Sequence, residues 1–197
     1  MRPNSVILPL AALAALAVSQ GAAAAMLWDE SINGDLSNDG LTPTSLTFNS
    51  GSNQIIGATG DGGLGVDRDY FRFTLAPDQV LTSITLLGNT TVSGSFSFIG
   101  IQPGPQLTVQ PSGAGGNALL GWTHYSANDI NHDILAAITP IGFLAPGTYS
   151  VWIQDTGGPV TYGFDFAVTT VPLPPAVLLM ASGLLGLGLF RRRTCAA

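Results

Sequence analysis

Apolar and polar residues alternate in short segments between residues 45 and 170. In the segment 69–75, Phe71, Phe73 and Leu75 fall on one face, and the residues between them fall on the other. A period of two is typical of a strand that buries one face. The pattern therefore predicts a strand over 69–75.

Five further segments rich in β-branched and aromatic residues predict strands: 80–87, 95–101, 119–125, 148–154 and 161–168. Between them lie turn-forming groups, such as Ala145-Pro146-Gly147, whose residues fix or permit turn dihedrals. One segment, 128–138, predicts a short helix. The expected fold of residues 26–170 is an all-β antiparallel sandwich, jelly-roll-like in architecture.

The N-terminal segment 1–25 has the pattern of a secretory signal peptide. Arg2 precedes the apolar run 6–18, and small residues follow at 21–25. This order predicts cleavage near Ala25 by signal peptidase after transfer by the general export machinery. A permanent helical anchor is the alternative, although the run is short for a bilayer span.

The C-terminal segment 171–197 combines three features. A proline-containing motif comes first and consists of Val171, Pro172, Leu173 and Pro174, followed by Pro175. Uncharged residues over 176–190 then predict a transmembrane helix near the lower length limit for a bilayer. A basic cluster of Arg191, Arg192 and Arg193 follows. Because basic residues stay cytoplasmic, this cluster places the body on the far side of the inner membrane.

This motif, helix and basic cluster together resemble the PEP-CTERM sorting signal of Gram-negative bacteria, although Leu173 stands where the family's Glu is expected. The resemblance implies recognition by an exosortase, a membrane-embedded transpeptidase that cuts near the motif. It also implies export across the inner membrane, transient anchoring there, and a final place at the cell surface or in an extracellular polysaccharide matrix, as in biofilms. An ordinary membrane anchor is the alternative, with the same orientation and no processing.

Charge is distributed unevenly along the chain. All twelve acidic residues lie in 26–170, where Arg68 and Arg72 are the only basic residues, so this body carries a net charge of −10. Such a body is not expected to bind nucleic acid, which requires clustered basic residues.

Cys195 is the single cysteine, which excludes an intramolecular disulfide and a cysteine-based metal site. No oligomeric state is favoured by the pattern.

Three parts of the body follow one another in a recognisable order. The segment Asp-Glu-Ser-Ile-Asn-Gly-Asp-Leu-Ser opens the body at 29–37, Asp-Arg-Asp-Tyr-Phe follows at 67–71, and the segments 144–153 and 162–168 come near its end. These parts resemble the opening strand, the Asp-x-Asp-Tyr-Phe strand and the closing hairpin of bacterial pre-peptidase C-terminal domains. Domains of that family are β-sandwiches attached to secreted enzymes and surface proteins.

Asp67 and Asp69 are candidate calcium ligands, because Ca²⁺ prefers six to eight oxygen ligands and an exported acidic body would meet this ion. Other acids could contribute to the site: Asp61, Asp29, Glu30, Asp35 and Asp39. Turn capping by these aspartates is the competing interpretation. No EF-hand loop is present, and no other cofactor is expected.

Catalytic motifs are weak. Gly60-Asp61-Gly62-Gly63-Leu64-Gly65 matches a dinucleotide motif in letters, but it precedes a strand rather than a helix, so a loop is predicted. His124 and His132 lack the partners of a zinc site or a nucleophilic triad. Paired carboxylates for glycoside hydrolysis remain an open but weak alternative. A non-enzymatic protein is expected.

Exposed aromatic residues are the remaining binding feature. A sugar-stacking platform could use Trp122, Tyr125, Trp152 or Tyr162. Trp28 is expected to pack beneath the first strand. The leading hypothesis is an exported, non-enzymatic surface or matrix protein, and the alternative is a glycan- or calcium-binding module associated with extracellular polysaccharide.

Overall fold

A computed structural model describes residues 24–63, 65–91, 97–113 and 115–171. The described strands are β1 (Ala25–Asp29), β2 (Thr44–Ser45), β3 (Gly51–Asp61), β4 (Val66–Leu75), β5 (Gln79–Leu86), β6 (Phe98–Pro103), β7 (Gly121–His124), β8 (Gly147–Gln154) and β9 (Val160–Thr170). The described helices are short: α1 (Glu30–Asn33), η1 (Gly116–Ala118), η2 (Ala127–Asp129) and α2 (Leu135–Ile138). None of these helices has the length and apolar character needed to cross a membrane.

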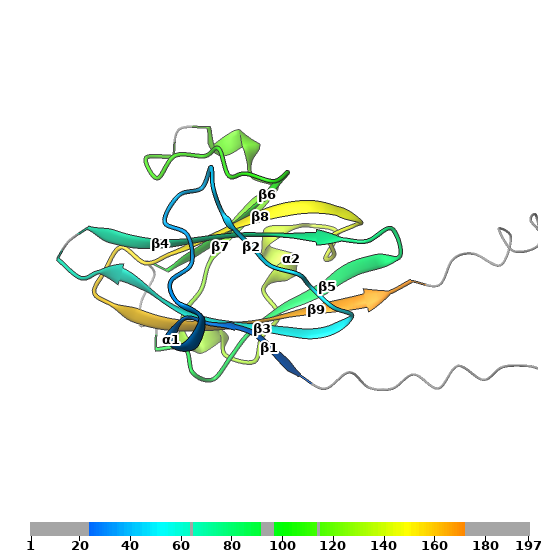
Figure 1. Ribbon diagram of the computed structural model, residues 1–197, viewed down its shortest axis with the longest axis horizontal. Coiled ribbons are helices and arrows are strands. Elements are labelled where there is room, and N and C mark those ends of the chain that lie inside the picture. The colour runs from blue at the N-terminus through cyan, green and yellow to red at the C-terminus, as the bar shows by residue number, and fades with distance from the viewer. Residues whose placement is uncertain (1–23, 64, 92–96, 114, 172–197) are drawn as a thin grey trace, which may run out of the picture.

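The strands form two facing layers (Figure 1). One layer has the order β1-β3-β9-β5, and the other has the order β2-β4-β8-β6-β7. Pairing is antiparallel except for β1 with β3 and β2 with β4. The layers meet where β3 and β4 pair at their tips, Gly60 opposite Asp67. The expected all-β, mostly antiparallel fold is confirmed.

The main core lies between the two layers. Phe71, Phe73 and Leu75 on β4 are all buried, as the alternating pattern predicts. Phe73 stacks on Phe48 with ring centroids 4.2 Å apart, and Phe166 of β9 contacts both rings from the opposite layer. Aromatic packing of this kind bridges the two sheets.

The predicted strands correspond to β4, β5, β6, β7, β8 and β9, with shifted bounds. β4 begins at Val66, three residues before the predicted start, and β9 runs on to Thr170. β7 is shorter than its prediction and covers only Gly121–His124. The segment 128–138 was expected to hold a short helix, and it contains α2 and the end of η2, which Ile130 (φ −58°, ψ 132°) and the following residues separate.

The longest element that the sequence pattern did not predict is β3, a strand of eleven residues. Its sequence is rich in small and polar residues, which give a weak strand signal. β3 nevertheless pairs with β9 from Gly51 to Thr59 and with β1 on its other side. Gly60 and Asp61 are the last residues of this strand, so the loop predicted at 60–65 is wrong for its first two residues.

Two strand arrangements expected from the pre-peptidase resemblance are also wrong. The opening strand β1 ends at Asp29, and the segment that follows forms helix α1 because Asp29 caps its first turn. β8 and β9 do not pair as a hairpin: β8 pairs with β4 and β6, and β9 pairs with β3 and β5. The turn at 155–159 therefore carries the chain from one layer to the other.

The first and last described residues leave the sandwich at the same end (Figure 1). Ala25 lies opposite Asn53 on β3, and Asn53 lies opposite Phe166 near the end of β9. Val171 is still attached to the body, because its backbone N–H donates to the Asp78 carbonyl at 2.7 Å. Residues 1–23 of the predicted signal peptide, the predicted transmembrane helix, the motif from Pro172 onward and the basic cluster lie outside the described residues, and Ala25, the predicted cleavage position, begins β1.

Candidate functional site

Three carboxylates meet at one edge of the sandwich. Glu30 comes from α1, Asp35 from the loop after it, and Asp69 from β4. One oxygen from each residue lies within 4.8 Å of the others. Asp35 is exposed, Glu30 is half-buried and Asp69 is fully buried, so the acidic cluster opens to solvent on the Asp35 side.

Asp69 lies on the inner face of β4, in the same alternation that places Phe71 in the core. Its Oδ2 accepts a 2.7 Å hydrogen bond from the Tyr162 hydroxyl on β9. Its Oδ1 is buried and has no hydrogen-bond partner among the described residues. A buried carboxylate oxygen without a partner is costly, which indicates that a proton or a cation completes this group.

Backbone N–H groups hold the Glu30 carboxylate in place. Its Oε1 accepts from Leu36 at 3.1 Å, and its Oε2 accepts from Ala58 on β3 at 2.8 Å. Glu30 begins α1, whose start is fixed by the Asp29 side chain accepting from the Ser31 N–H. The cap thus aims Glu30 back across β3 toward Asp69.

Gly57 on β3 makes room for this arrangement. A Cβ at Gly57 would overlap the Tyr162 hydroxyl and lie 2.9 Å from Glu30 Cδ. Only glycine at this position lets both side chains pass over β3 to reach Asp69. At position 57 the weak strand signal of β3 therefore has a local cause, since a larger side chain would push Tyr162 and Glu30 away from Asp69.

Electrostatics in the cluster favour binding of a positive charge. Burial and, to a lesser extent, the Glu30 charge together raise the pKa of Asp69 to about 9, although the Tyr162 hydrogen bond opposes the shift. Burial also raises the pKa of Glu30. Burial and the charge of Asp67 raise the pKa of Asp35. Each acid is thus harder to ionise without a compensating cation.

The other predicted acids lie outside the cluster. Asp67 shares the face of Asp69 and is near enough to raise its pKa, but it is not one of the three converging carboxylates. Asp39 and Asp61 cap local turns by accepting backbone N–H groups from Leu41 and Gly63. Of the two calcium candidates, only Asp69 joins the cluster, and Glu30 and Asp35 join it from the opening acids.

The arrangement can hold a hard cation. Two oxygens bound to one Ca²⁺ at 2.3–2.6 Å can be at most about 5 Å apart, which accommodates the observed spacing. Three carboxylates supply half of a calcium shell, and water can enter beside exposed Asp35. Without a cation, the same geometry suits one proton shared between Asp69 and Glu30.

The two histidines and the nearby acids, Asp129 and Asp133, have local structural surroundings. His124 Nδ1 lies 2.8 Å from the Ser97 carbonyl on the exposed side of β7, and His132 is exposed. Asp129 forms a capping box with Ser126 at the start of η2. Asp133 accepts the backbone N–H groups of Ile84 and Leu135. These contacts organise loops.

Only one member of the predicted aromatic platform is exposed. Trp122 on β7 exposes 52% of its surface, whereas Tyr125, Trp152 and Tyr162 are buried. Trp28, predicted to lie beneath the first strand, belongs to β1, and its Nε1 donates to the Gly34 carbonyl. Of these four alternatives for a stacking platform, Trp122 is therefore the one whose ring is accessible.

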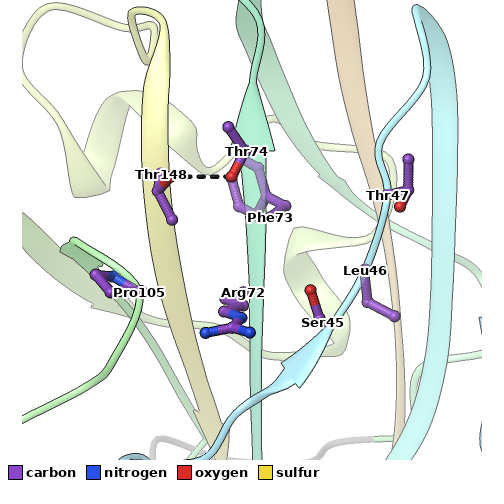
Figure 2. Close-up of a pocket in the computed structure, with 8 residues that line it drawn as sticks. All are labelled: Ser45, Leu46, Thr47, Arg72, Phe73, Thr74, Pro105 and Thr148. Carbon is purple, nitrogen blue, oxygen red and sulfur yellow. Dashed lines mark hydrogen bonds between the residues drawn. The ribbon is translucent and has the colours of Figure 1, made fainter.

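A separate hollow of about 350 Å³ lies on the outer face of β2, β4 and β8 (Figure 2). Arg72 is its only charged lining residue, and the hydroxyls of Thr74 and Thr148 form a 2.9 Å hydrogen bond beside it. Thr47 and Ser45 add further hydroxyl groups to the lining. This Arg72 hollow provides one positive charge on an acidic body.

The chain matches no protein-family model, and no curated protein matches it.

Proposed function

We propose that this chain is an exported, non-enzymatic protein of the cell surface or extracellular matrix. Signal peptidase removes residues 1–25 after export, and an exosortase-type transpeptidase processes the segment 171–197 in the manner of a PEP-CTERM protein. The body is then a jelly-roll-like β-sandwich at the surface or in the matrix, and strand β4 with its Asp-x-Asp-Tyr-Phe sequence is the part that still resembles pre-peptidase C-terminal domains. The observation that carries this proposal is the motif, apolar segment and arginine cluster that follow the acidic body.

The position of the chain ends supports this topology. Both described ends leave one end of the sandwich, so a signal peptide and a C-terminal anchor can be attached without crossing the body. The motif begins at Val171, which is still hydrogen-bonded to the body. Cleavage within the motif therefore releases a sandwich with almost no linker.

Mass spectrometry of the native protein tests the sorting proposal. The mature chain is expected to begin near Met26 and to end near Pro174. A mature chain that keeps Arg191, Arg192 and Arg193 would contradict processing and favour an ordinary membrane anchor. The arginine cluster itself supplies the control, because replacing its three residues by glutamine should prevent orientation and processing together.

A second function is favoured by the orphaned Oδ1 of Asp69: we propose that Glu30, Asp35 and Asp69 bind Ca²⁺. Ca²⁺ would replace the proton shared by Asp69 and Glu30 and would supply the counter-charge that lets the three carboxylates ionise together. Binding would also hold α1 and β4 together, since the ligands come from both elements.

Calcium titration of the chelator-treated protein tests this second proposal. At free calcium a hundredfold above Kd, ligand binding should add about 2.7 kcal/mol to the free energy of unfolding. Asp69→Asn should abolish the calcium-dependent rise in melting temperature. Asp78→Asn is the matched control, because Asp78 is exposed and lies outside the cluster. An unchanged melting temperature in the parent chain would contradict calcium binding.

A further inference from the structure

A row of aromatic side chains lies on the outer face of the β4-β8-β6-β7 sheet, on the side opposite the main core. Neighbouring ring centroids are 5.9 Å apart for Tyr70 and Trp152, 4.7 Å for Trp152 and Phe98, and 5.8 Å for Phe98 and Trp122. We call these four residues the outer aromatic row. It crosses four strands and ends at Trp122 on the edge strand β7.

Gly100 on β6 explains how the row is continuous. It lies opposite Trp122 on one side and opposite Trp152 on the other. A Cβ at Gly100 would lie 2.8 Å from Phe98 Cζ, so the missing side chain leaves space for the Phe98 ring to lie between the two indoles. The sheet surface here is therefore lined with aromatic rings.

The segment between β6 and β7 covers one half of the row and leaves the other half open. Figure 1 shows this green segment on the outer side of β6 and β8. Leu107 and Val109 pack with Tyr70 and Trp152, which are buried beneath them. Trp122 stays exposed and lines a pocket of about 460 Å³, to whose lining Phe98 and Trp152 also belong.

The polar groups of the pocket are neutral hydrogen-bonding groups. Trp152 Nε1 is buried without a partner among the described residues. Gln154 Oε1 accepts from Arg68 Nε at 3.0 Å, which leaves the Gln154 amide N–H groups for a ligand. Asn117 also lines the pocket, and every described residue in its lining is uncharged.

We propose that this pocket binds a neutral saccharide, with one sugar ring stacked on Trp122. A sugar ring has an apolar C–H face that suits an exposed indole and hydroxyl groups that suit unpaired N–H and amide groups. The uncharged lining and the net charge of −10 on the body disfavour acidic polymers. The proposal deepens the proposed function, from which it takes access to extracellular polysaccharide, but binding itself does not depend on sorting.

Titration of the full-length protein tests the proposal. The protein is held in a non-glycosidic detergent and titrated with neutral oligosaccharides of glucose, galactose, mannose and N-acetylglucosamine, with alginate and polygalacturonate oligomers as acidic comparators. Calorimetry and tryptophan fluorescence report binding. Saturable binding of at least one neutral series is expected, and Trp122→Ala should weaken it at least about tenfold.

Three control variants identify the surface. Trp122→Phe should keep most of the affinity, because a phenyl ring still stacks. Phe143→Ala removes an exposed aromatic ring elsewhere and should leave binding unchanged. Arg72→Ala removes the cation of the Arg72 hollow and should also leave binding unchanged.

Four results would overturn the proposal. The first is no saturable binding of any neutral series, and the second is binding that Trp122→Ala leaves intact. The third is preferential binding of the acidic oligomers that Arg72→Ala abolishes, which would transfer the site to the Arg72 hollow. The fourth is a sugar-free oligomer that Trp122→Ala dissociates, which would make this surface a contact between copies. None of these results bears on the processing of segment 171–197, which mass spectrometry tests separately.

Discussion

The Tyr162 hydroxyl donates a 2.7 Å hydrogen bond to Asp69 Oδ2 across the interior of the sandwich. Tyr162 belongs to β9 and Asp69 to β4, so this bond joins the two sheets at the acidic cluster. It places a carboxylate at the inner end of a cluster whose outer end, Asp35, is exposed to solvent.

Removing the Tyr162 hydroxyl should destabilise the protein. Tyr162→Phe leaves Asp69 Oδ2 buried without a donor, and the free energy of unfolding should fall by about 1–3 kcal/mol. Urea unfolding at neutral pH measures the change. Tyr149→Phe is the control, because its hydroxyl bonds the Ala145 carbonyl at an exposed position and its loss should cost less. Equal losses in the two variants would contradict an interior role for the Tyr162 bond.

Stability without calcium should fall as pH rises. The pKa of Asp69 is raised to about 9 in the folded chain, whereas an unfolded aspartate has a pKa of about 3.9. Below the lower value both states are protonated. Between the two values the folded state binds one more proton, so the free energy of unfolding falls by about 1.4 kcal/mol per pH unit until the folded carboxyl ionises.

Urea unfolding in chelator between pH 5 and pH 8 measures this slope. Asp69→Asn should reduce the slope, because the amide does not titrate, and the raised pKa of Glu30 accounts for the part that remains. Asp78→Asn should leave the slope as in the parent chain, since Asp78 is exposed. A slope of the opposite sign in the parent chain would show that Asp69 is ionised in the folded state.

Gly57→Ala should disrupt the acidic cluster through its packing. The added Cβ would overlap the Tyr162 hydroxyl and press on Glu30, and overpacking of this kind costs about 1–3 kcal/mol. Thermal unfolding measures the loss, and calcium titration should show weaker binding. Gly62→Ala is the matched control, because a Cβ there has no atoms within 4 Å and should change stability by no more than about 0.5 kcal/mol.

Phe73→Ala should be among the most destabilising single changes in the core. Phe73 is 1% exposed and contacts Phe48 and Phe166, so its removal opens a cavity between the sheets. The expected loss is about 3–5 kcal/mol by chemical denaturation. Phe143→Ala removes the same side chain from a position that is 42% exposed. A comparable loss in that variant would contradict the assignment of the core.

The alternation in 69–75 was enough to predict β4 and its buried face, because the identity of each residue there agrees with its burial. β3 was not predicted, since its small and polar residues fit contacts with residues that are distant in the sequence. Gly57 is small because Tyr162 and Glu30 pass over it. Pairing with β9 then forms the strand despite its low intrinsic preference.

The candidate sites show the same division. The sequence identified Asp69 and the opening acids as possible ligands, but it could not separate Glu30 and Asp35, which converge on Asp69, from Asp39 and Asp61, which cap turns. Nor could it separate Trp122 from three buried aromatic residues. Spacing along a strand gives the face of a residue and does not give what covers that face.

By itself, the sequence determined the all-β class and the acidic body, and it predicted sorting signals at the two ends, because composition, charge and local periodicity are properties of short segments. Only the tertiary structure decided which acids meet and which tryptophan stays exposed. Those outcomes depend on contacts between elements far apart in the chain, such as Tyr162 with Asp69 and the segment after β6 with Trp152.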